Sequence, residues 1–404
     1  MAPNNSLVPT AVEKENTVVK DDHSNEANIG LLNRKNKNVL NSNDQIKQDL
    51  DQNGNEIEVQ YENQLINDEE EYKIEYAWFN IIGFIFLHYA LIIGITKIKI
   101  DPLHVFTFIF GMFTGFGITA GAHRLWAHGS YKANLGLRLF LTFWQTAAFQ
   151  NSIYEWTRDH RVHHKFTDTN ADPHNASRGF FFSHIGWLMC KKHPDVKKFG
   201  KKVDLSDLKR DPIVMFQHKY YLILMPICCF LIPIFIPTLW GVSFINSTYA
   251  CILRWVIVLH FTWLVNSYAH IWGNKPYNEN IKPTDSYTVS MLAFGEGWHN
   301  YHHVFPYDYK TSEHGKYWCN YTTGFLEFCA KIGWATDLKT VSAEVIRKRV
   351  LRTGDGSHSI SQNNSQQSTQ KKKNEREEFI WGWQDNLLTE NEKKYVTVVN
   401  KSLA

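Results

Sequence analysis

The sequence predicts an all-α membrane protein in which four transmembrane helices carry a helical cap on the cytosolic side. Among the 404 residues, four apolar runs are almost free of charge, and basic residues concentrate between the second and third runs. Eight of the nineteen histidines form three tight clusters next to these runs. We therefore expect the cap to hold a metal site made of imidazole nitrogens.

The four apolar runs have the length of membrane spans, because a helix needs about 20 residues to cross a bilayer core. We expect spans at about 76–95, 105–122, 220–240 and 244–266. Three prolines in the third run would kink its helix without forbidding it, since neighbours can satisfy the freed backbone groups. Arg254 interrupts the fourth run and is expensive at membrane depth, so it should face a partner or the bundle interior.

A shorter apolar stretch at 135–149 contains Arg138 and Gln145, and we interpret it as an interfacial or re-entrant segment. The orientation of the chain follows from its basic residues. Residues 121–219 hold sixteen Lys and Arg, whereas the loop 241–246 holds none. This bias places both termini and all three histidine clusters on the cytosolic side.

The two ends of the chain differ in composition from the membrane domain at 71–353. Residues 1–70 carry fourteen acidic and six basic side chains, so this acidic N-terminal tail is expected to be disordered. It has no apolar segment near Met1, which argues against a cleaved signal peptide. The C-terminal tail at 354–404 is expected to be mostly disordered, although Phe379–Trp383 could dock weakly.

The spacing of the histidines predicts how they present their rings. The clusters at 160–164 and 299–303 share the pattern HxxHH, which places three imidazoles within one narrow arc of a helix. His123 and His128 are five residues apart, so we expect a helix end or a bend between them. With His270, nine imidazoles exceed the coordination of one ion and imply two metals. Imidazole suits zinc, copper, iron and nickel, so ligand type alone does not choose the metal.

For other residues near the clusters, the sequence allows a role at the metal site or an ordinary structural role. Five carboxylates could accept the second ring proton of ligating histidines or could be solvated at the surface: Glu155, Asp159, Asp168, Asp172 and Glu296. Isolated histidines on apolar segments are interpreted as core residues: His88, His104, His218 and His260. Four more are interpreted as solvated or interfacial: His174, His184, His193 and His314. The six cysteines lack CxxC spacing and are expected to be small buried side chains.

The residues around the clusters resemble a known family. HRLWAH at 123–128, EWTRDHRVHH at 155–164 and GEGWHNYHH at 295–303 resemble the three histidine boxes of acyl-CoA desaturases of the stearoyl-CoA (delta-9) type. The likeness runs from about Tyr72 to the RTGDGSH stretch that ends at His358. Residues 71–353 would then be a membrane desaturase domain, and both tails fall largely outside the resemblance.

The resemblance implies a multi-pass protein of the endoplasmic reticulum membrane, whose cytosolic cap holds two Fe²⁺ ions. The implied metal ligands are His123, His128, His160, His163, His164, His270, His299, His302 and His303. Asn266, one helical turn before His270, would hold a metal through a water molecule. Catalysis would rest on the di-iron centre, and no separate side-chain acid or base is expected.

By the same resemblance, the enzyme would use dioxygen to introduce a cis double bond into a saturated long-chain acyl-CoA. The implied headgroup contacts are Asn151, Arg158, Asp159, Lys191 and Lys192, although the two lysines could equally be a solvated pair. Trp156 and Trp263 could wall the acyl tunnel or anchor at the membrane interface. Thr107, Gly111 and Gly115, spaced by four on the second span, are expected at the closed end of the tunnel or in a helix packing seam.

Electrons are expected from separate proteins, because the chain has neither an HPGG haem motif nor a GxGxxG flavin fingerprint. The resemblance implies cytochrome b5 and its NADH-dependent reductase. The N-terminal tail is acidic while the whole chain has a net charge of +3, so the body is basic and suits an acidic carrier. Membrane lipid is a further expected partner, and nucleic acid is not.

Three alternatives remain open from the sequence. A desaturase of other regiospecificity or a hydroxylase would share the same metals. A membrane zinc hydrolase would need one metal and would not require nine nitrogens. A non-enzymatic lipid-binding or scaffolding membrane protein would keep the clusters as structural metal staples.

Overall fold

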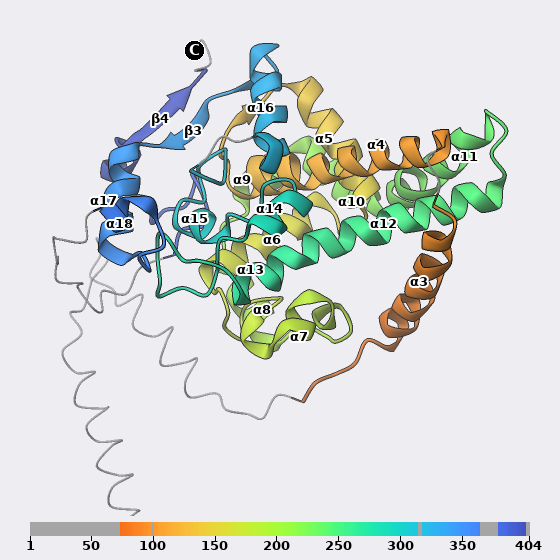
Figure 1. The fold of residues 1–404 in the computed structure, drawn as a ribbon, viewed down its shortest axis with the longest axis horizontal. Helices are drawn as coiled ribbons and strands as arrows, with labels where there is room; N and C mark the ends of the chain where they lie inside the picture. Colours follow the sequence, from red (N-terminus) through yellow and green to blue (C-terminus); the bar gives the residue numbers. More distant parts are fainter. Residues whose placement is uncertain (1–72, 99–100, 314–316, 364–378, 401–404) are drawn as a thin grey trace, which may run out of the picture. The chain divides into compact units, whose positions relative to one another are not determined.

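The computed structural model describes residues 73–98, 101–313, 317–363 and 379–400. The described part is mainly helical, as predicted, with two small two-stranded sheets (Figure 1). The acidic tail predicted at 1–70 lies outside the described residues.

Four helical segments are long and apolar enough to cross a membrane, which confirms the four predicted spans. They are α3 (Trp78–Thr96); α4 (Pro102–Phe116) with the π-helix η1 (Gly117–Ala127); α10 (Pro212–Pro226) with the π-helix η4 (Ile227–Leu231) and α11 (Ile232–Thr238); and α12 (Phe244–Asn266) with α13 (Tyr268–Ile271). The second and third segments are longer than their apolar runs, because the helices continue past the apolar residues.

Three of these segments begin at a side chain that accepts from free backbone N–H groups of the first turn. Asp101 caps α4, Asp211 caps α10 and Ser243 caps α12. In α4 and α10 the next residue is a proline, at the position where a helix needs no N–H donor. Residues at the start of each of these three spans therefore stabilise the beginning of its helix.

The remaining elements form the cap and its connections. The helices are α5 (Leu135–Ala148), α6 (Ile153–Lys165), η2 (Ala176–Arg178), α7 (Phe180–His184), η3 (Gly186–Leu188), α8 (Pro194–Gly200), α9 (Ser206–Arg210), α14 (Tyr287–Leu292), α15 (His299–Val304), η5 (Tyr317–Cys319), α16 (Tyr321–Lys331), α17 (Ala343–Thr353), α18 (Ser359–Asn363) and α19 (Glu390–Lys393). Strand β1 (Lys132–Ala133) pairs with β2 (Ala335–Thr336), and β3 (Leu338–Val341) pairs with β4 (Val396–Val399), both antiparallel.

Helix α5 covers the apolar stretch that we interpreted as interfacial or re-entrant. At a rise of about 1.5 Å per residue it is too short to span a bilayer. Leu137 and Leu141 are fully buried, while Leu135 and Leu139 on the other side are exposed. The buried leucines share a core with Ile153 of α6, so α5 holds the helix that carries the second histidine cluster. The interfacial placement of α5 stays a prediction.

The third and fourth spans contain the prolines and the arginine that the sequence singled out. The prolines mark irregularities: α10 gives way to the π-helix η4 directly after Pro226, and Pro233 lies in the first turn of α11, which begins at Ile232. Arg254 is buried, and its guanidinium donates to the backbone carbonyls of Ala147 and Cys229. The arginine thus faces the interior of the bundle and not the lipid.

The C-terminal tail, predicted to be mostly disordered, has a described stretch at 379–400 that packs on the cap, while 364–378 and 401–404 lie outside the described residues. Strand β4 completes a sheet with β3, and Trp381 and Leu388 are buried. Leu388 belongs to an apolar cluster with Tyr307. The composition of 354–404 as a whole is polar. It does not reveal the two short apolar groups, around Trp381 to Leu388 and in β4, that pack on the cap.

Candidate metal centre

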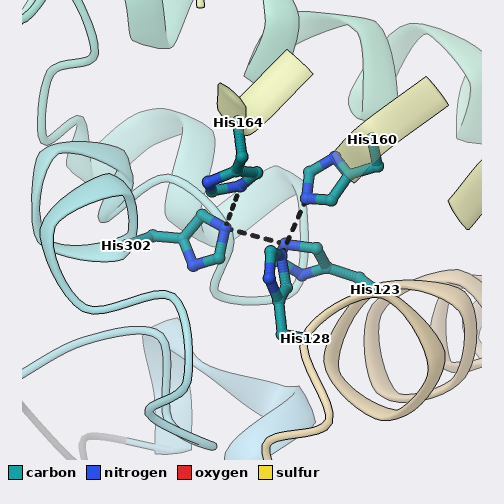
Figure 2. A group of neighbouring side chains, drawn as sticks. All are labelled: His123, His128, His160, His164 and His302. Atoms are coloured by element: carbon teal, nitrogen blue, oxygen red, sulfur yellow. Dashed lines mark hydrogen bonds between the residues drawn. The ribbon is translucent and has the colours of Figure 1, made fainter. Parts of the chain in front are cut away.

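The structure brings all nine histidines of the predicted set together in two groups. One nitrogen from each member lies within 4.8 Å of those of the other members of its group. Five histidines form the first group: His123, His128, His160, His164 and His302. Four form the second group: His163, His270, His299 and His303. Figure 2 shows the rings of the five-histidine group pointing toward one another from three different parts of the chain.

The first cluster converges because the second span ends as a π-helix. His123 lies in η1, and the N–H of His128 donates to the carbonyl of His123 at 3.1 Å. This i→i+5 hydrogen bond brings two residues that are five apart into the same turn. The predicted helix end lies at Ala127, so the expectation is confirmed, with π-helical geometry as the physical means.

The second and third clusters lie on α6 and α15, as their spacing predicted. Ser152 caps α6 by accepting from the N–H of Glu155. Asp285 Oδ1 accepts from the N–H groups of Asn300 and Tyr301 in the first turn of α15, at 2.9 and 3.2 Å. In both helices, a side-chain oxygen therefore accepts from backbone N–H groups of the first turn and stabilises the helix that carries the imidazoles.

The ninth histidine comes from the end of the fourth span. Helix α12 ends at Asn266, and Ser267 interrupts the helix before the short α13 that carries His270. The Ser267 hydroxyl donates to the carbonyl of Trp263 and faces His184 Nδ1 at 2.9 Å. This break turns His270 toward the four-histidine group, while Asn266 lines the cavities beside it.

Four of the nine rings have a carboxylate or backbone carbonyl oxygen close to Nδ1. Asp172 lies 2.8 Å from His163 Nδ1, Asp168 lies 3.0 Å from His270 Nδ1, and Glu296 lies 3.0 Å from His123 Nδ1. The fourth acceptor is the backbone carbonyl of Trp381, which faces His128 Nδ1. Carboxylates and carbonyls accept only, so the three rings that form a hydrogen bond there, His128, His163 and His270, carry a proton on Nδ1 and direct Nε2 inward.

The inward nitrogens fit a pair of metal ions. His123 Nε2 faces His302 Nε2 at 3.0 Å, and His163 Nε2 faces His303 Nε2 at 3.3 Å. His302 Nε2 also faces His164 Nε2 at 3.0 Å, and a single ring proton cannot serve both neighbours. Cations held between these nitrogens would satisfy lone pairs that hydrogen bonds among the rings cannot. The donor set is all imidazole, which binds first-row transition metals.

Burial keeps most of these rings neutral. Desolvation and neighbouring imidazoles lower the pKa values of His128, His160 and His164 well below the usual range for histidine. The pKa values of His299, His302 and His303 are lowered for the same reasons. His163 is the exception: burial lowers its pKa, but the contact with Asp172 outweighs burial and raises it overall. Neutral imidazole is the form that binds metal, so the electrostatics suit the site.

The five candidate carboxylates divide into two kinds. Asp168, Asp172 and Glu296 lie next to ring nitrogens of the histidines. Glu296 also forms an ion pair with Arg124, whose Nη2 lies 2.9 Å from Oε1. Asp159 instead pairs with Arg158 at 2.9 Å and with Lys192. Glu155 accepts from the hydroxyl of Ser152. The sequence could not separate these cases, because the distinction depends on which ring each carboxylate meets across elements.

Two cavities lead to the histidines. The larger, about 420 Å³, is lined mainly by apolar and aromatic residues of α3, α12 and the segment around Trp187. The smaller, about 50 Å³, lies deeper, between η1, α12 and Phe294. Both are lined by Trp156, His160, Thr262 and Asn266. These shared residues make the two cavities neighbours at the edge of the metal centre.

The predicted substrate contacts occupy different places. Asn151, Trp156, Asp159 and Trp263 line the larger cavity. Arg158 lies beside it through its ion pair with Asp159, and Lys192 reaches the same carboxylate. Lys191 is exposed and pairs with Glu75 at 2.5 Å. Lys191 and Lys192 line a separate small pocket of about 10 Å³.

The three predicted tunnel-end residues are separated in the structure. Gly115 lines the smaller cavity, where a Cβ would lie 2.6 Å from the ring of Phe294. Gly111 is packed against Arg254, whose Cγ would lie 3.2 Å from an added Cβ. Thr107 donates its hydroxyl to the carbonyl of Leu103. The structure thus brings Gly115 to the cavity and places Gly111 in a helix packing contact.

The isolated histidines show one difference from expectation. His88 and His260 face each other at 3.1 Å, His104 pairs with Asp101 and His218 pairs with Ser152, in line with ordinary structural roles. His174, expected to be solvated or interfacial, is instead buried beside Asp172 and lines the larger cavity, and His314 lies outside the described residues. Burial lowers its pKa to about 3.

Two contributors to the site had no interpretable pattern in the sequence. Phe294 closes the smaller cavity against Gly115, and Trp381 orients His128 through its backbone carbonyl. The nearest indication was the aromatic pair at 381 and 383, which we expected to dock only weakly. A backbone acceptor has no residue type of its own, so its position is visible only in the fold.

Comparisons with known proteins agree with this geometry. The fatty acid desaturase family model matches residues 102–331, which contain all nine histidines. The chain is 56% identical over 297 residues to the acyl-CoA Delta-9 desaturase of Acheta domesticus, covering 72% of this chain and 82% of that protein. It is 49% identical over 326 residues to the acyl-CoA Delta12-desaturase of the same organism, with coverage of 79% and 85%. It is 52% identical over 292 residues to the stearoyl-CoA desaturase of Homo sapiens, with coverage of 71% and 80%.

Proposed function

Because this chain belongs to the fatty acid desaturase family, we propose that it is an oxygen-dependent acyl-CoA desaturase that introduces a cis double bond at the delta-9 position of a saturated long-chain acyl-CoA. One observation carries the proposal. Two groups of imidazoles lie at the place where two apolar cavities meet, beside His160 and Asn266. A chain that passes from one cavity to the other would bring its methylene groups to both groups of ligands.

The proposed metals are two Fe²⁺ ions, held by the five-histidine group and by the four-histidine group. Asn266 would complete the smaller group through a water molecule. Iron bound there would supply the dioxygen chemistry that removes hydrogen from unactivated methylenes, with two electrons and two protons from outside and two waters as products. Nine imidazole nitrogens exceed what a single zinc needs, which favours this proposal over a membrane hydrolase.

The residues of the cavities would hold the acyl chain by shape. A saturated chain offers no polar group, so apolar and aromatic walls give both binding and alignment. Trp156 and Thr262 line both cavities, and Gln150 Nε2 donates to the Thr262 hydroxyl at 3.0 Å. This hydrogen bond fixes a side chain where the cavities meet, and so helps to set which carbons lie beside the ligands.

The coenzyme A headgroup is proposed to bind where Asp159 organises two cations. Asp159 lines the larger cavity and pairs with Arg158 and with Lys192. Guanidinium and ammonium groups bind phosphates strongly, and Asn151 lines the same cavity. The acid would orient the two cations rather than contact phosphate, because like charges repel.

Electron transfer and location extend the proposal. The described helices carry no haem or flavin motif, so we assign electron supply to cytochrome b5 and its NADH-dependent reductase. We place the protein in the endoplasmic reticulum membrane with both termini in the cytosol. The four apolar helices support a multi-pass membrane protein, and the positive-inside bias supports the orientation.

The decisive experiment expresses the full chain in cells that lack their own acyl-CoA desaturase. Double bonds would be located by mass spectrometry and bound metal counted by elemental analysis. We expect new cis delta-9 double bonds and two irons per chain. His302→Ala should abolish product, whereas His104→Ala, outside the metal centre, should retain it. A new bond at another position would correct the regiochemistry alone. Absence of any new double bond in an iron-loaded chain with an electron donor would reject the proposed function.

A further inference from the structure

The C-terminal strap, defined here as residues 379–400, reaches the metal centre from outside the region that the family model matches. Its strand β4 pairs with β3 from Leu338↔Val399 to Val341↔Val396. Trp381, Asp385 and Leu388 of the strap are all nearly inaccessible to solvent. Figure 1 shows β4 alongside β3, close to α17. The strap is therefore packed into the cap and not merely laid on its surface.

The strap contacts the metal ligand His128 through two of its backbone groups. The carbonyl of Trp381 accepts from His128 Nδ1, and the N–H of Trp383 donates to the carbonyl of His128 at 2.9 Å. Gly382 lies between these two residues, and a Cβ there would lie 2.6 Å from the His128 carbonyl oxygen. Only a glycine allows the two backbones to approach this closely.

A second glycine lies on the other side of the contact, in a backbone conformation that residues with a side chain rarely adopt. Gly129, directly after His128, has a φ of +57°, and a Cβ there would collide with the side chain of Gln384. The chain therefore has a glycine on each backbone at the one place where strap and ligand meet. Glycine often marks a site where another backbone approaches closely, so these two glycines indicate a specific contact between the strap and His128.

Side chains fix the strap on both sides of this contact. The Arg161 guanidinium lies 3.8 Å from the ring of Trp381, and Arg161 itself donates to the carbonyls of Trp126 and Ala127. Lys165 pairs with Asp385 at 2.9 Å, and Asp385 accepts from the N–H of Trp381. Arg161 and Lys165 lie on α6, the helix that carries the second histidine cluster. The strap thus links His128 to that helix.

His128 differs from the other oriented ligands in the source of its partner. The carboxylates at His123, His163 and His270 come from residues within the matched family region. The acceptor at His128 comes from a residue 253 positions away. Partners at the second nitrogen fix the tautomer and the direction of a ligating imidazole, and their loss typically weakens metal binding by about 10–100-fold.

We propose that the C-terminal strap completes the five-histidine metal site by orienting His128, so that displacing the strap releases metal from this group and leaves the four-histidine group loaded. The inference rests on the proposed two-metal centre. Trp381 acts here as a positioning residue, through its backbone carbonyl. The strap makes the integrity of one metal site depend on the C-terminal segment of the chain.

The test compares full-length variants by their bound metal. Gly382→Val should separate the strap from His128, and Thr397→Ala, at an exposed position of β4, is the matched control within the strap. After dialysis against a chelator, we expect two ions per chain in the wild type and in Thr397→Ala, and about one in Gly382→Val. In a His302→Ala background, which already lacks the five-histidine site, Gly382→Val should change the remaining ion's retention by less than twofold.

Add-back of the strap separates a local effect from misfolding. A chain that ends at Asn363 should hold about one ion and regain the second when a synthetic peptide of residues 376–404 is added. The same peptide with Gly382→Val should not restore it. Equal retention of two ions by wild type and Gly382→Val would overturn the inference, as would loss of both ions that the peptide does not reverse. A wild type that binds fewer than two ions would instead refute the two-metal centre, and the inference with it.

Discussion

Arg254 on the fourth span donates from Nη2 to the backbone carbonyl of Cys229 on the third span, at 2.9 Å. In an α-helix this carbonyl would accept from the residue four positions later, but Pro233 stands there and has no N–H. The thiol of Cys251 also lies 3.2 Å from the same oxygen. The arginine that seemed costly at membrane depth thus gives this carbonyl a donor from the neighbouring span.

Arg254→Lys should destabilise the protein, because lysine lacks the planar fork whose Nη1 and Nη2 donate to the carbonyls of Ala147 and Cys229. We expect a loss of about 1–3 kcal/mol, typical of a lost hydrogen bond to a charged group. The loss should be smaller in a Pro233→Ala background, where Cys229 gains a helical donor. Thermal unfolding of the four proteins in detergent measures this coupling, and strictly additive effects would show that the proline and the arginine are independent.

Asp172→Asn should weaken metal binding at the four-histidine group. The two oxygens of Asp172 accept from His163 Nδ1 and from the N–H groups of Asp168 and His174, so an amide must turn a donor toward a donor. We expect about a 10–100-fold loss of affinity for one of two ions. Glu155→Gln is the control, since Glu155 contacts Ser152 and no ring nitrogen. Equal metal retention by both variants would argue against the orienting role of Asp172.

Gly115→Ala should shift the products toward shorter acyl chains if the smaller cavity holds the far part of the substrate. The added methyl group would meet the ring of Phe294, which cannot move without reducing a cavity of about 50 Å³. Gly111→Leu should also shorten the acyl chains of the products only if the tunnel extends past the contact between Gly111 and Arg254. Chain-length profiles of the products separate the two positions, and unchanged profiles in both variants would remove these glycines from the tunnel.

Lys339 should make stability depend on pH above neutrality. Burial lowers the pKa of this lysine from 10.5 to about 8, while its ammonium donates to the carbonyls of Gly129 and Asp337. Between these two values the unfolded chain binds more protons than the folded one, so stability should rise with pH across that window. Below pH 8 both states are protonated and the cost of burying the charge is constant. Lys339→Met should lose the rise between pH 8 and 10 in thermal unfolding, and a rise of equal size in the variant would contradict the assignment.

The sequence anticipated the elements that depend on local chemistry. The four apolar runs predicted the four spans, although the second and third helices begin earlier than expected, at Pro102 and Pro212, after the capping residues Asp101 and Asp211. The five-residue spacing of His123 and His128 indicated an interruption, although not that a π-helix would bring both rings to one site. Polar composition misled at the C-terminus, because the apolar groups that dock there are short and far apart in the sequence.

The sequence by itself determined the four spans and the set of nine imidazoles, because hydropathy and ligand chemistry belong to individual residues and short runs. Only the tertiary structure decided that the nine rings divide into five and four, that Asp172 meets a ring while Glu155 does not, and that Trp381 orients His128. Each of these depends on groups from distant segments meeting within about 3 Å, a range over which hydrogen bonds form or fail. No local pattern encodes such a distance, because packing of the whole cap sets it.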